Sequence, residues 1–486
     1  MKRTAQLYLV IIGIAGIIFF ILHLGNQLPR PVSTVPAKSE LTAHPLPVGG
    51  SSFVASVKSS LGKNASGPLS RLILQLIVII GASSIVGLIF TRWRQPAVVG
   101  EMVAGILLGP SLFGLLAPDL FHFVFATSTL GVLGLFSQIG VCLFLFVVGM
   151  ELDVSHVRNK AEAAVVISHA SIVVPYLLGV TLALFVYSYL AQPAVSFTAF
   201  ALFMGISMSI TAFPVLVRIL QDRGIFKTSL GSTATTCAAV DDVTAWSMLA
   251  FVVAIAGAKN VGAAVTSVAF VLIFVVFMLF VIKPSLPRWL GRAALERAAP
   301  SRTVMAVVIG VALVSALSSE IIGIHALFGA FLAGIVMPGT AGFRDKLVMR
   351  VENLTAVLLL PLFFAFTGLR TQIGLLNSAQ DWLICFVIIG VATAGKLGGS
   401  AVAARLTGMK WRESFQLGAL MNTRGLMELI ALNIGYDMGI LSQRIFTMLV
   451  IMALVTTIMT GPLLVLLARR REDESPLDPR PILSGS

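Results

Sequence analysis

The stretch TSLGSTATTCAAVDDVTAWSMLAFVVAIAG, from Thr228 to Gly257, carries two adjacent aspartates, Asp241 and Asp242, and no other charged side chain. A charge at the centre of a bilayer is costly, so it is retained where it faces a cavity, a partner or a transported ion. This stretch therefore predicts a membrane-spanning helix with a functional centre, in a chain built for lipid.

The composition of the whole chain agrees with a membrane protein. Of its 486 residues 57% are hydrophobic and only 11% are charged, and the apolar residues form long blocks. A helix needs about 20 apolar residues to cross the hydrocarbon core. The net charge of +13 lies in short connectors between blocks, so it orients the chain and does not indicate nucleic-acid binding. All three cysteines fall inside apolar blocks, which indicates neither a disulfide framework nor a thiolate metal site.

The chain divides into an anchor, a linker and a series of apolar blocks. Residues 1–25 are predicted to be an uncleaved signal anchor, with a cleaved signal as the alternative, and residues 26–70 a flexible external linker. Thirteen further blocks follow, at residues 72–91, 96–116, 129–150, 162–190, 196–220, 228–257, 262–282, 303–319, 322–338, 353–369, 382–404, 413–436 and 445–468. With the anchor they make fourteen spans, so both ends should lie on the same side.

Basic residues test this count independently, because cytoplasmic connectors carry an excess of Lys and Arg. With the N-terminus inside, the cytoplasmic connectors hold Arg92, Arg94, Arg158, Lys160, Arg223, Lys227, Lys283, Arg288, Arg292, Arg297, Arg302, Arg344, Lys346, Arg350, Arg405, Lys410, Arg412 and Arg469 to Arg471. After the linker, the external side holds only Lys259, Arg370 and Arg444. The pattern predicts a multi-pass membrane protein with a cytoplasmic C-terminus, and we expect its membrane to be a bacterial inner membrane.

An internal repeat is visible in two successive matches. GEMVAGILLGP (100–110) aligns with GAFLAGIVMPG (329–339), and LFLFVVGM (143–150) aligns with LFFAFTGL (362–369). We therefore predict six-helix repeats at 71–257 and 303–468, joined by a helix and basic connector at 258–302 and followed by a short cytoplasmic tail at 469–486. Corresponding helices run in opposite directions, as in the inverted repeats of many secondary transporters. Glycine-rich packing helices that resemble each other by composition are the alternative.

The fifth helix of each repeat is a candidate for interruption near the midplane. In the first, Ser207, Ser209 and Thr211 precede Pro214, which removes a backbone donor and frees a carbonyl one turn earlier. An ordinary proline kink is the alternative reading. In the second, the polar run from Asn422 to Gly425 lies mid-segment. Interrupted helices can offer carbonyls to a cation and helix ends to charges.

Lys396 lies in the middle of the block at 382–404 and should be paired or neutral. Asp241 and Asp242 differ by about 100° around a helix, so one carboxylate can pair with Lys396 while the other faces a cavity. A cation arriving at an unpaired carboxylate favours its ionised form and expels its proton. Competition at one carboxylate is thus a complete exchange mechanism, and it requires no cofactor.

Together with Lys396, the motifs PAVVGEMVAGILLGPSLFG, AAVDDVTAW, PLFFAFTGL and NTRGLMELIALNIG resemble the monovalent cation:proton antiporter-2 family over about residues 71–468. That family holds bacterial sodium/proton antiporters, Kef-type potassium efflux systems and plant cation/proton exchangers. The resemblance implies a thirteen-helix antiporter fold, all helical, with crossed discontinuous helices, an elevator movement and a homodimer.

Site residues follow from the same resemblance, position by position. It implies that Asp242 binds the proton and, transiently, the monovalent cation, that Asp241 pairs with Lys396, and that Thr211 belongs to the unwound crossing. Ser207 and Pro214 lie in that first crossing helix, and Arg424 and Glu428 match the second. An Asp-Asp pair with a lysine resembles the electrogenic members, which leads to the hypothesis of two protons per sodium ion.

Several alternatives stay open. The short tail after Arg471 lacks the nucleotide-binding domain of gated Kef systems, so a potassium/proton antiporter or a potassium efflux pathway without such a domain is the second reading. An enzyme is not expected: an intramembrane aspartyl protease needs aspartates from separate helices, whereas these are adjacent. Glu101 and Glu428 could be second ion ligands, and His122, His325 and Glu320 could sense pH, although structural or solvated roles are favoured for all five.

Overall fold

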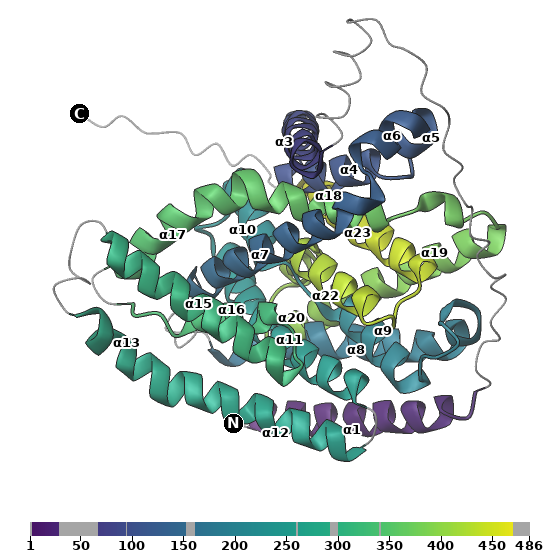
Figure 1. Cartoon of the computed structure of the whole chain (residues 1–486). Coiled ribbons are helices and arrows are strands. Elements are labelled where there is room, and N and C mark those ends of the chain that lie inside the picture. Colours follow the sequence, from purple (N-terminus) through teal and green to yellow (C-terminus); the bar gives the residue numbers. More distant parts are fainter. Residues whose placement is uncertain are drawn as a thin grey trace, which may run out of the picture.

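The computed structural model describes residues 2–28, 67–93, 95–151, 161–258, 261–291, 300–339 and 342–469, and every regular element in these ranges is a helix (Figure 1). Eleven helical segments in these ranges, some of them made of consecutive helices, are long and apolar enough to cross a membrane. The prediction of an all-helical membrane protein is confirmed. Most of the predicted linker and nearly all of the predicted tail lie outside the described residues, as do Arg94, Arg158, Lys160, Lys259, Arg292, Arg297, Arg470 and Arg471.

The helices of the N-terminal half and the linking helix are α1 (Lys2–Gly25), α3 (Pro68–Arg92), α4 (Ala97–Leu108), α5 (Phe113–Leu116), α6 (Pro118–Val124), α7 (Thr127–Glu151), α8 (Ala161–Leu190), α9 (Phe197–Ser209), α10 (Phe213–Asp222), α11 (Ser229–Gly257), α12 (Val261–Phe277) and α13 (Lys283–Leu290). Those of the C-terminal half are α15 (Arg302–Ile322), α16 (Ala326–Ile335), α17 (Phe343–Leu354), α18 (Leu360–Arg370), α19 (Ala379–Thr393), α20 (Gly399–Leu406), α21 (Trp411–Met421), α22 (Leu426–Asp437) and α23 (Gln443–Arg469).

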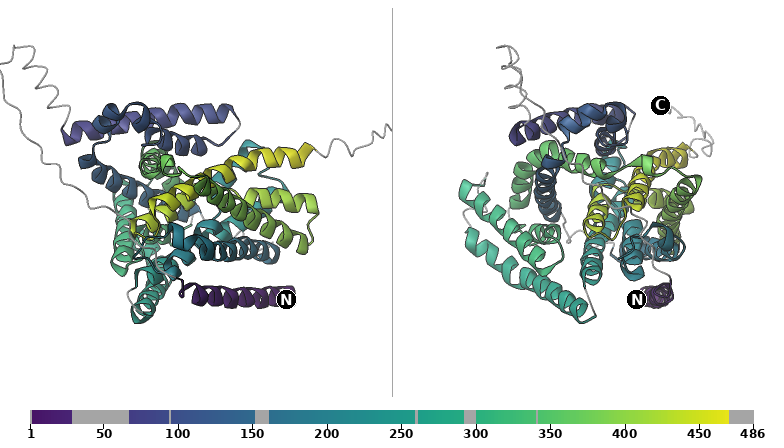
Figure 2. Two further views of the ribbon diagram at one scale, coloured as in Figure 1. Left: turned by 90° about the vertical axis from the view of Figure 1, so that its right-hand side faces the viewer. Right: turned by 45° about the vertical axis from the view of Figure 1, so that its right-hand side comes forward.

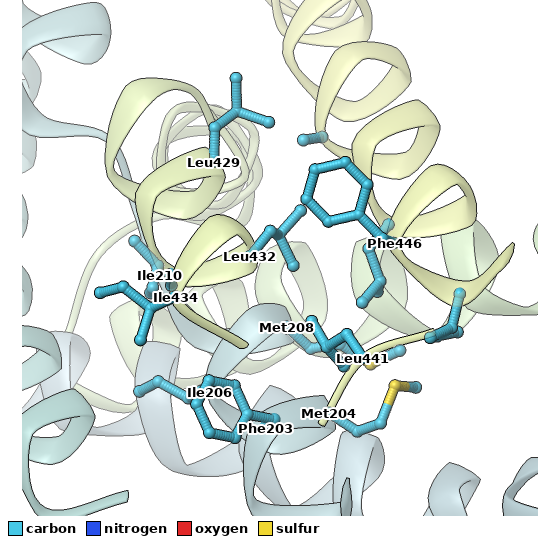
Figure 3. Packing of buried hydrophobic residues seen from close by; sticks show 14 of the residues in the cluster. Phe203, Met204, Ile206, Met208, Ile210, Leu429, Leu432, Ile434, Leu441 and Phe446 are labelled. Atoms are coloured by element: carbon cyan, nitrogen blue, oxygen red, sulfur yellow. The ribbon is translucent and has the colours of Figure 1, made fainter. Parts of the chain in front are cut away.

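These helices pack as two groups. In the first, which we call the core group, α8 packs against α9, α11 and α20, while α23 packs against α19, α21 and α22. In the second, the scaffold group, α4 packs against α3 and α18, while α16 packs against α7 and α15. Helix α12 contacts both α11 and α15 and so connects the groups at the edge of the bundle (Figure 1). Side chains of α9, α22 and α23, among them Phe203, Leu432 and Phe446, fill the interior of the core group (Figure 3).

The extra helix α1 lies against α8 and α9 of the core group. Its last residue, Gly25, is in such close contact with Phe197 at the start of α9 that a Cβ atom there would overlap the ring. The beginning of α1 and the end of α23 lie at the same end of the bundle (Figure 2, left). We call this the terminal end, and the opposite one the far end; α9 therefore begins at the far end and α11 at the terminal end.

Two glycine contacts hold the scaffold group together. Gly105 of α4 meets Gly368 of α18, and Gly149 of α7 meets Gly334 of α16, each pair so close that a Cβ atom would overlap backbone atoms of the facing helix. The alignment of the two repeats matches Gly105 with Gly334 and Gly149 with Gly368. The two contacts are therefore equivalent under the proposed repeat.

Substitution of Gly368 by alanine should consequently force α4 and α18 apart. Overpacking of this kind costs about 1–3 kcal/mol. Gly390, a helical glycine with open space around its Cα, is the matched control. We expect thermal unfolding in detergent to show a lower midpoint for Gly368→Ala than for wild type and no lowering for Gly390→Ala. Equal midpoints for the two variants would contradict the close crossing.

Three block boundaries predicted from the sequence are wrong. The linking helix was expected to end at residue 282, but it continues through a π-helical turn (Met278–Ile282) to Leu290, because Leu286 and Leu290 are buried in the scaffold group's core. The block predicted at 353–369 begins at Phe343, since an amphipathic stretch buries Phe343, Leu347 and Val351 between charged residues.

The third error concerns the block at 96–116. Its helix ends at Leu108, because Gly109 is extended and contacts the backbone of Gly368 too closely for any side chain. A short helix, α5, follows only from Phe113. Mean hydropathy could not reveal this break, since the residues on both sides of it are apolar.

Candidate site at two crossed, broken helices

Two membrane segments are interrupted, and their interruptions cross inside the core group. The first separates α9 from α10 at Ile210–Ala212, and the second separates α21 from α22 at Asn422–Gly425. The Ala212 amide donates to the Thr423 carbonyl at 3.0 Å, and the Thr211 hydroxyl oxygen lies 3.2 Å from the Met421 carbonyl oxygen. Pro214 lies in the first turn of α10, where a backbone donor has no helical partner in any case. Both predicted interruptions are thus present in the structure.

Basic side chains cap the open end of α9. The guanidinium group of Arg424 donates to the carbonyl oxygens of Ser207 and Met208, each at 2.7 Å, and the Lys396 ammonium group donates to that of Ser209. These carbonyls form the negative end of a helix dipole, which cations stabilise. Arg424 also pairs with Glu428, in the first turn of α22, at 3.0 Å. Arg424 and Glu428 therefore act first as structural partners within the crossing.

Asp241 is fully paired. Its carboxylate lies 3.0 Å from the Lys396 Nζ atom, and both side chains are completely buried. Three hydroxyl groups also donate to it: Ser168 at 2.5 Å, Ser171 at 2.6 Å and Thr211 at 2.7 Å. Lys396 lies in a π-helical turn (Ala394–Gly398) and donates to the Ser171 carbonyl at 2.9 Å as well. π-Helical turns recur at functional sites, and this one directs the lysine into the crossing.

Asp242 contrasts with its neighbour. It is 1% exposed, yet neither carboxyl oxygen has a hydrogen-bond partner among the described residues. The amide of Phe213, at the start of α10, is close enough to interact with it without forming such a bond. The small cavity beside it is otherwise lined by apolar side chains, those of Ile210, Ala245, Trp246, Leu249 and Met427. Asp241 thus has a hydrogen-bonding or ionic partner at both oxygens, whereas Asp242 has none among the described residues and can bind a proton or a cation.

The structure brings together the residues predicted from the two aspartates, Lys396 and the crossing helices, and it adds two that the sequence reasoning missed. Ser168 and Ser171 of α8 bond Asp241, and nothing in their surroundings distinguishes them from packing serines of an apolar helix. Their spacing of three residues places both on one helix face, which was the available signal. The side chain of Asn422, in the second interruption, is buried with no partner for either amide atom within the described part of the chain.

The other candidates lie away from this centre. Glu101 is half-buried on α4 and lies against α3. Glu320 accepts a hydrogen bond from the Ala326 amide at 2.6 Å, and the His325 ring accepts one from the Leu327 amide, so both cap the start of α16. His122 packs edge-on against Phe121.

Comparison with known proteins agrees with this arrangement. The family model described as "Sodium/hydrogen exchanger, transmembrane" matches residues 79–470. The Na⁺/H⁺ antiporter NhaS4 of Synechocystis is 42% identical over 398 residues, which cover 82% of this chain and 97% of that protein. The K⁺/H⁺ antiporter 1 of Saccharomyces cerevisiae is 34% identical over 409 residues, or 82% of this chain, but these make up only 46% of the yeast protein.

A solved structure gives the fold independently. The sodium proton antiporter MjNhaP1 from Methanocaldococcus jannaschii superimposes with a TM-score of 0.59, at 14% sequence identity, over 83% of this chain and 99% of that one. The prediction of an antiporter fold is confirmed by this likeness. From the match to the family model and the identity to NhaS4, the chain belongs to the sodium/hydrogen exchanger family of transmembrane proteins.

Proposed function

We propose that the protein is a secondary active antiporter that exchanges a monovalent cation, sodium foremost, for protons by competition at Asp242. The observation that carries this proposal is the contrast within one pair of carboxylates. Asp241 has four partners, whereas Asp242 is buried beside it with none among the described residues. The relatives support the class of activity, since they are named as cation/proton antiporters and not as enzymes.

The electrostatics of the pair explain why a proton and a cation should compete. A buried carboxylate without a partner is far less costly when it is protonated. Lys396 is already paired with Asp241, so the pair together leaves a charge on Asp242 without a counter-ion of its own. Asp242 therefore needs either a proton or a cation from outside the protein. The unpartnered Asn422 amide in the crossing is a further candidate to contact that cation or its water.

Movement of the core group against the scaffold group would carry Asp242 from one side to the other, as in an elevator. Close backbone contact between the described helices of the two groups is largely confined to α4 and α23, which supports this reading. The terminal end is proposed to be cytoplasmic, in a bacterial inner membrane, and the protein to be a homodimer. The described basic connector residues on the terminal side, such as Arg92 and Lys410, support that orientation.

The proposal is tested by reconstitution into vesicles with a trapped pH dye. Added sodium should drive protons out of the vesicle interior against a gradient, and choline should not. A channel would only dissipate gradients, so the absence of uphill movement would contradict antiport. Parallel addition of potassium distinguishes sodium/proton exchange from the alternative, potassium/proton exchange. The name of the yeast relative, a K⁺/H⁺ antiporter, supports this alternative.

The number of protons exchanged per sodium ion can be tested in the same vesicles. If two protons move per sodium ion, each cycle carries one net charge, and an imposed membrane potential should change the rate of proton movement. We expect a potential set with potassium and valinomycin to accelerate or slow the sodium-driven flux according to its sign. Flux that ignores the potential would contradict electrogenic exchange while leaving antiport intact.

A further inference from the structure

The far end of the bundle is closed by side chains that join the two helix groups. Arg370, at the end of α18 in the scaffold group, pairs with Asp437, at the end of α22 in the core group, at 2.6 Å. It also donates to the Asn433 side chain at 2.8 Å, and Asn433 in turn donates to the Thr367 hydroxyl of α18 at 2.8 Å. Three polar contacts thus cross between α18 and α22.

Aromatic rings hold the arginine in place. Its guanidinium carbon lies 4.2 Å from the centre of the Phe366 ring, on its own helix, and 5.1 Å from that of Tyr436, on α22. Cations over ring faces are stabilised further, most of all where water is partly excluded. The Arg370 side chain is 19% exposed and that of Asp437 35%, so the pair is shielded from bulk water only in part. The adjoining cavity has a volume of about 20 Å³, room for about one water molecule.

A second contact between the groups lies deeper on the same side. Ala239, Asp242, Trp246 and Leu249 recur at helical spacing and so follow one face of α11. Trp246 packs against Phe331 of the scaffold helix α16, with ring centres 5.6 Å apart. Towards the far end Trp246 and Leu249 are 5% and 3% exposed, whereas Ala239, on the terminal side of Asp242, is half-buried. The far side of Asp242 on this helix face is thus closed by tightly packed side chains, whereas the face is more exposed on the terminal side.

From these contacts we infer that Arg370, Asp437 and Asn433 form a latch that keeps the far end closed while Asp242 faces the terminal end. The latch must open when Asp242 turns to the far end, because its partners stand on opposite helix groups. It therefore sets the balance between the two conformations, and Arg370 and Asp437 are positioning residues, since neither contacts Asp242. The inference rests on the proposed function, of which it specifies one conformational step.

Cysteine reporters test the latch without relying on transport. In a variant with Cys142, Cys237 and Cys385 replaced by alanine, Leu249→Cys reports on the far side of Asp242 and Ala239→Cys on the terminal side. The protein is placed in nanodiscs, where both faces are open to a polar maleimide. With Asp437→Asn or Arg370→Gln, we expect labelling at position 249 to become about 5-fold faster and labelling at position 239 to become slower. The double substitution should add little to either single one.

The opposite signs at the two reporters separate a latch from general loosening. Faster labelling at both positions, or no change at either, would overturn the inference. Arg444→Gln is the matched control, because Arg444 pairs with Asp381 at 3.6 Å at the same end but within the core group. It should move neither reporter. If wild-type vesicles fail to exchange ions while the reciprocal labelling persists, the proposed function fails and the latch stands.

Discussion

Replacing Asp242 with asparagine should reduce sodium-driven proton movement to the level of protein-free vesicles. Asparagine has nearly the shape of aspartate but can neither take up a proton nor carry the charge that a cation needs. Since neither carboxyl oxygen of Asp242 has a hydrogen-bond partner among the described residues, the substitution breaks no hydrogen bond. It also removes a carboxyl group that is buried without a partner, so the folded protein should be no less stable than wild type. Loss of transport without loss of stability is the expected signature.

The control for this experiment is Asp222→Asn, which removes an exposed carboxylate paired with Arg218 at 3.1 Å on α10. Exposed pairs of this kind contribute about 0–1 kcal/mol, and transport should be unchanged. Asp242→Glu keeps the carboxyl group but lengthens it inside a cavity lined by Trp246 and Met427. We expect residual exchange with altered cation dependence. Full transport activity in Asp242→Asn would exclude Asp242 as the exchange site of this protein.

The sequence predicted the features for which a membrane-spanning helix has few physical alternatives, namely isolated charges and interruptions. Charges isolated in an apolar helix must be paired or functional, and this reasoning located Asp241, Asp242 and Lys396. Polar runs and a proline in mid-segment located both interruptions. Their crossing, with the Ala212 amide on the Thr423 carbonyl, joins residues more than 200 positions apart and follows only from the tertiary arrangement.

What the sequence left undetermined is equally physical in origin. Residue patterns alone left open which aspartate pairs with Lys396, and only the family resemblance assigned Asp241, because the pairing depends on helix rotation and the π-helical turn at Ala394–Gly398 has no signature in composition. The block at 353–369 was predicted to begin too late because α17 is rich in charged residues, although Leu347 and Val351 are buried. Arg370 was recognised only as an external basic residue; its partner Asp437 lies on a helix of the other group, far along the chain.

The second large effect is expected at Lys396, and it concerns stability. Lys396→Met would leave Asp241 ionised in a completely buried place with only three hydroxyl donors. Breaking a buried ion pair by removing one partner costs about 3–5 kcal/mol. We expect a clearly lower midpoint of thermal unfolding in detergent, whereas Lys410→Met, at an exposed connector, should leave the midpoint unchanged.

Adding Asp241→Asn to Lys396→Met should recover most of that loss, because neutral replacements of a buried pair are often as stable as the pair itself. With its carbonyl oxygen in the Oδ2 position, asparagine can still accept hydrogen bonds from Ser171 and Thr211, and its amide group can donate to the Ser168 hydroxyl. The two single substitutions and the double one form a cycle, whose coupling energy measures the pair. Additive losses would mean that Lys396 serves mainly the carbonyl groups of Ser171 and Ser209, to which it also donates. A large favourable coupling energy would instead show that Lys396 mainly stabilises Asp241. In that case the fold holds the Asp241 carboxylate in a fixed ion pair and leaves the Asp242 carboxylate to exchange its proton or cation.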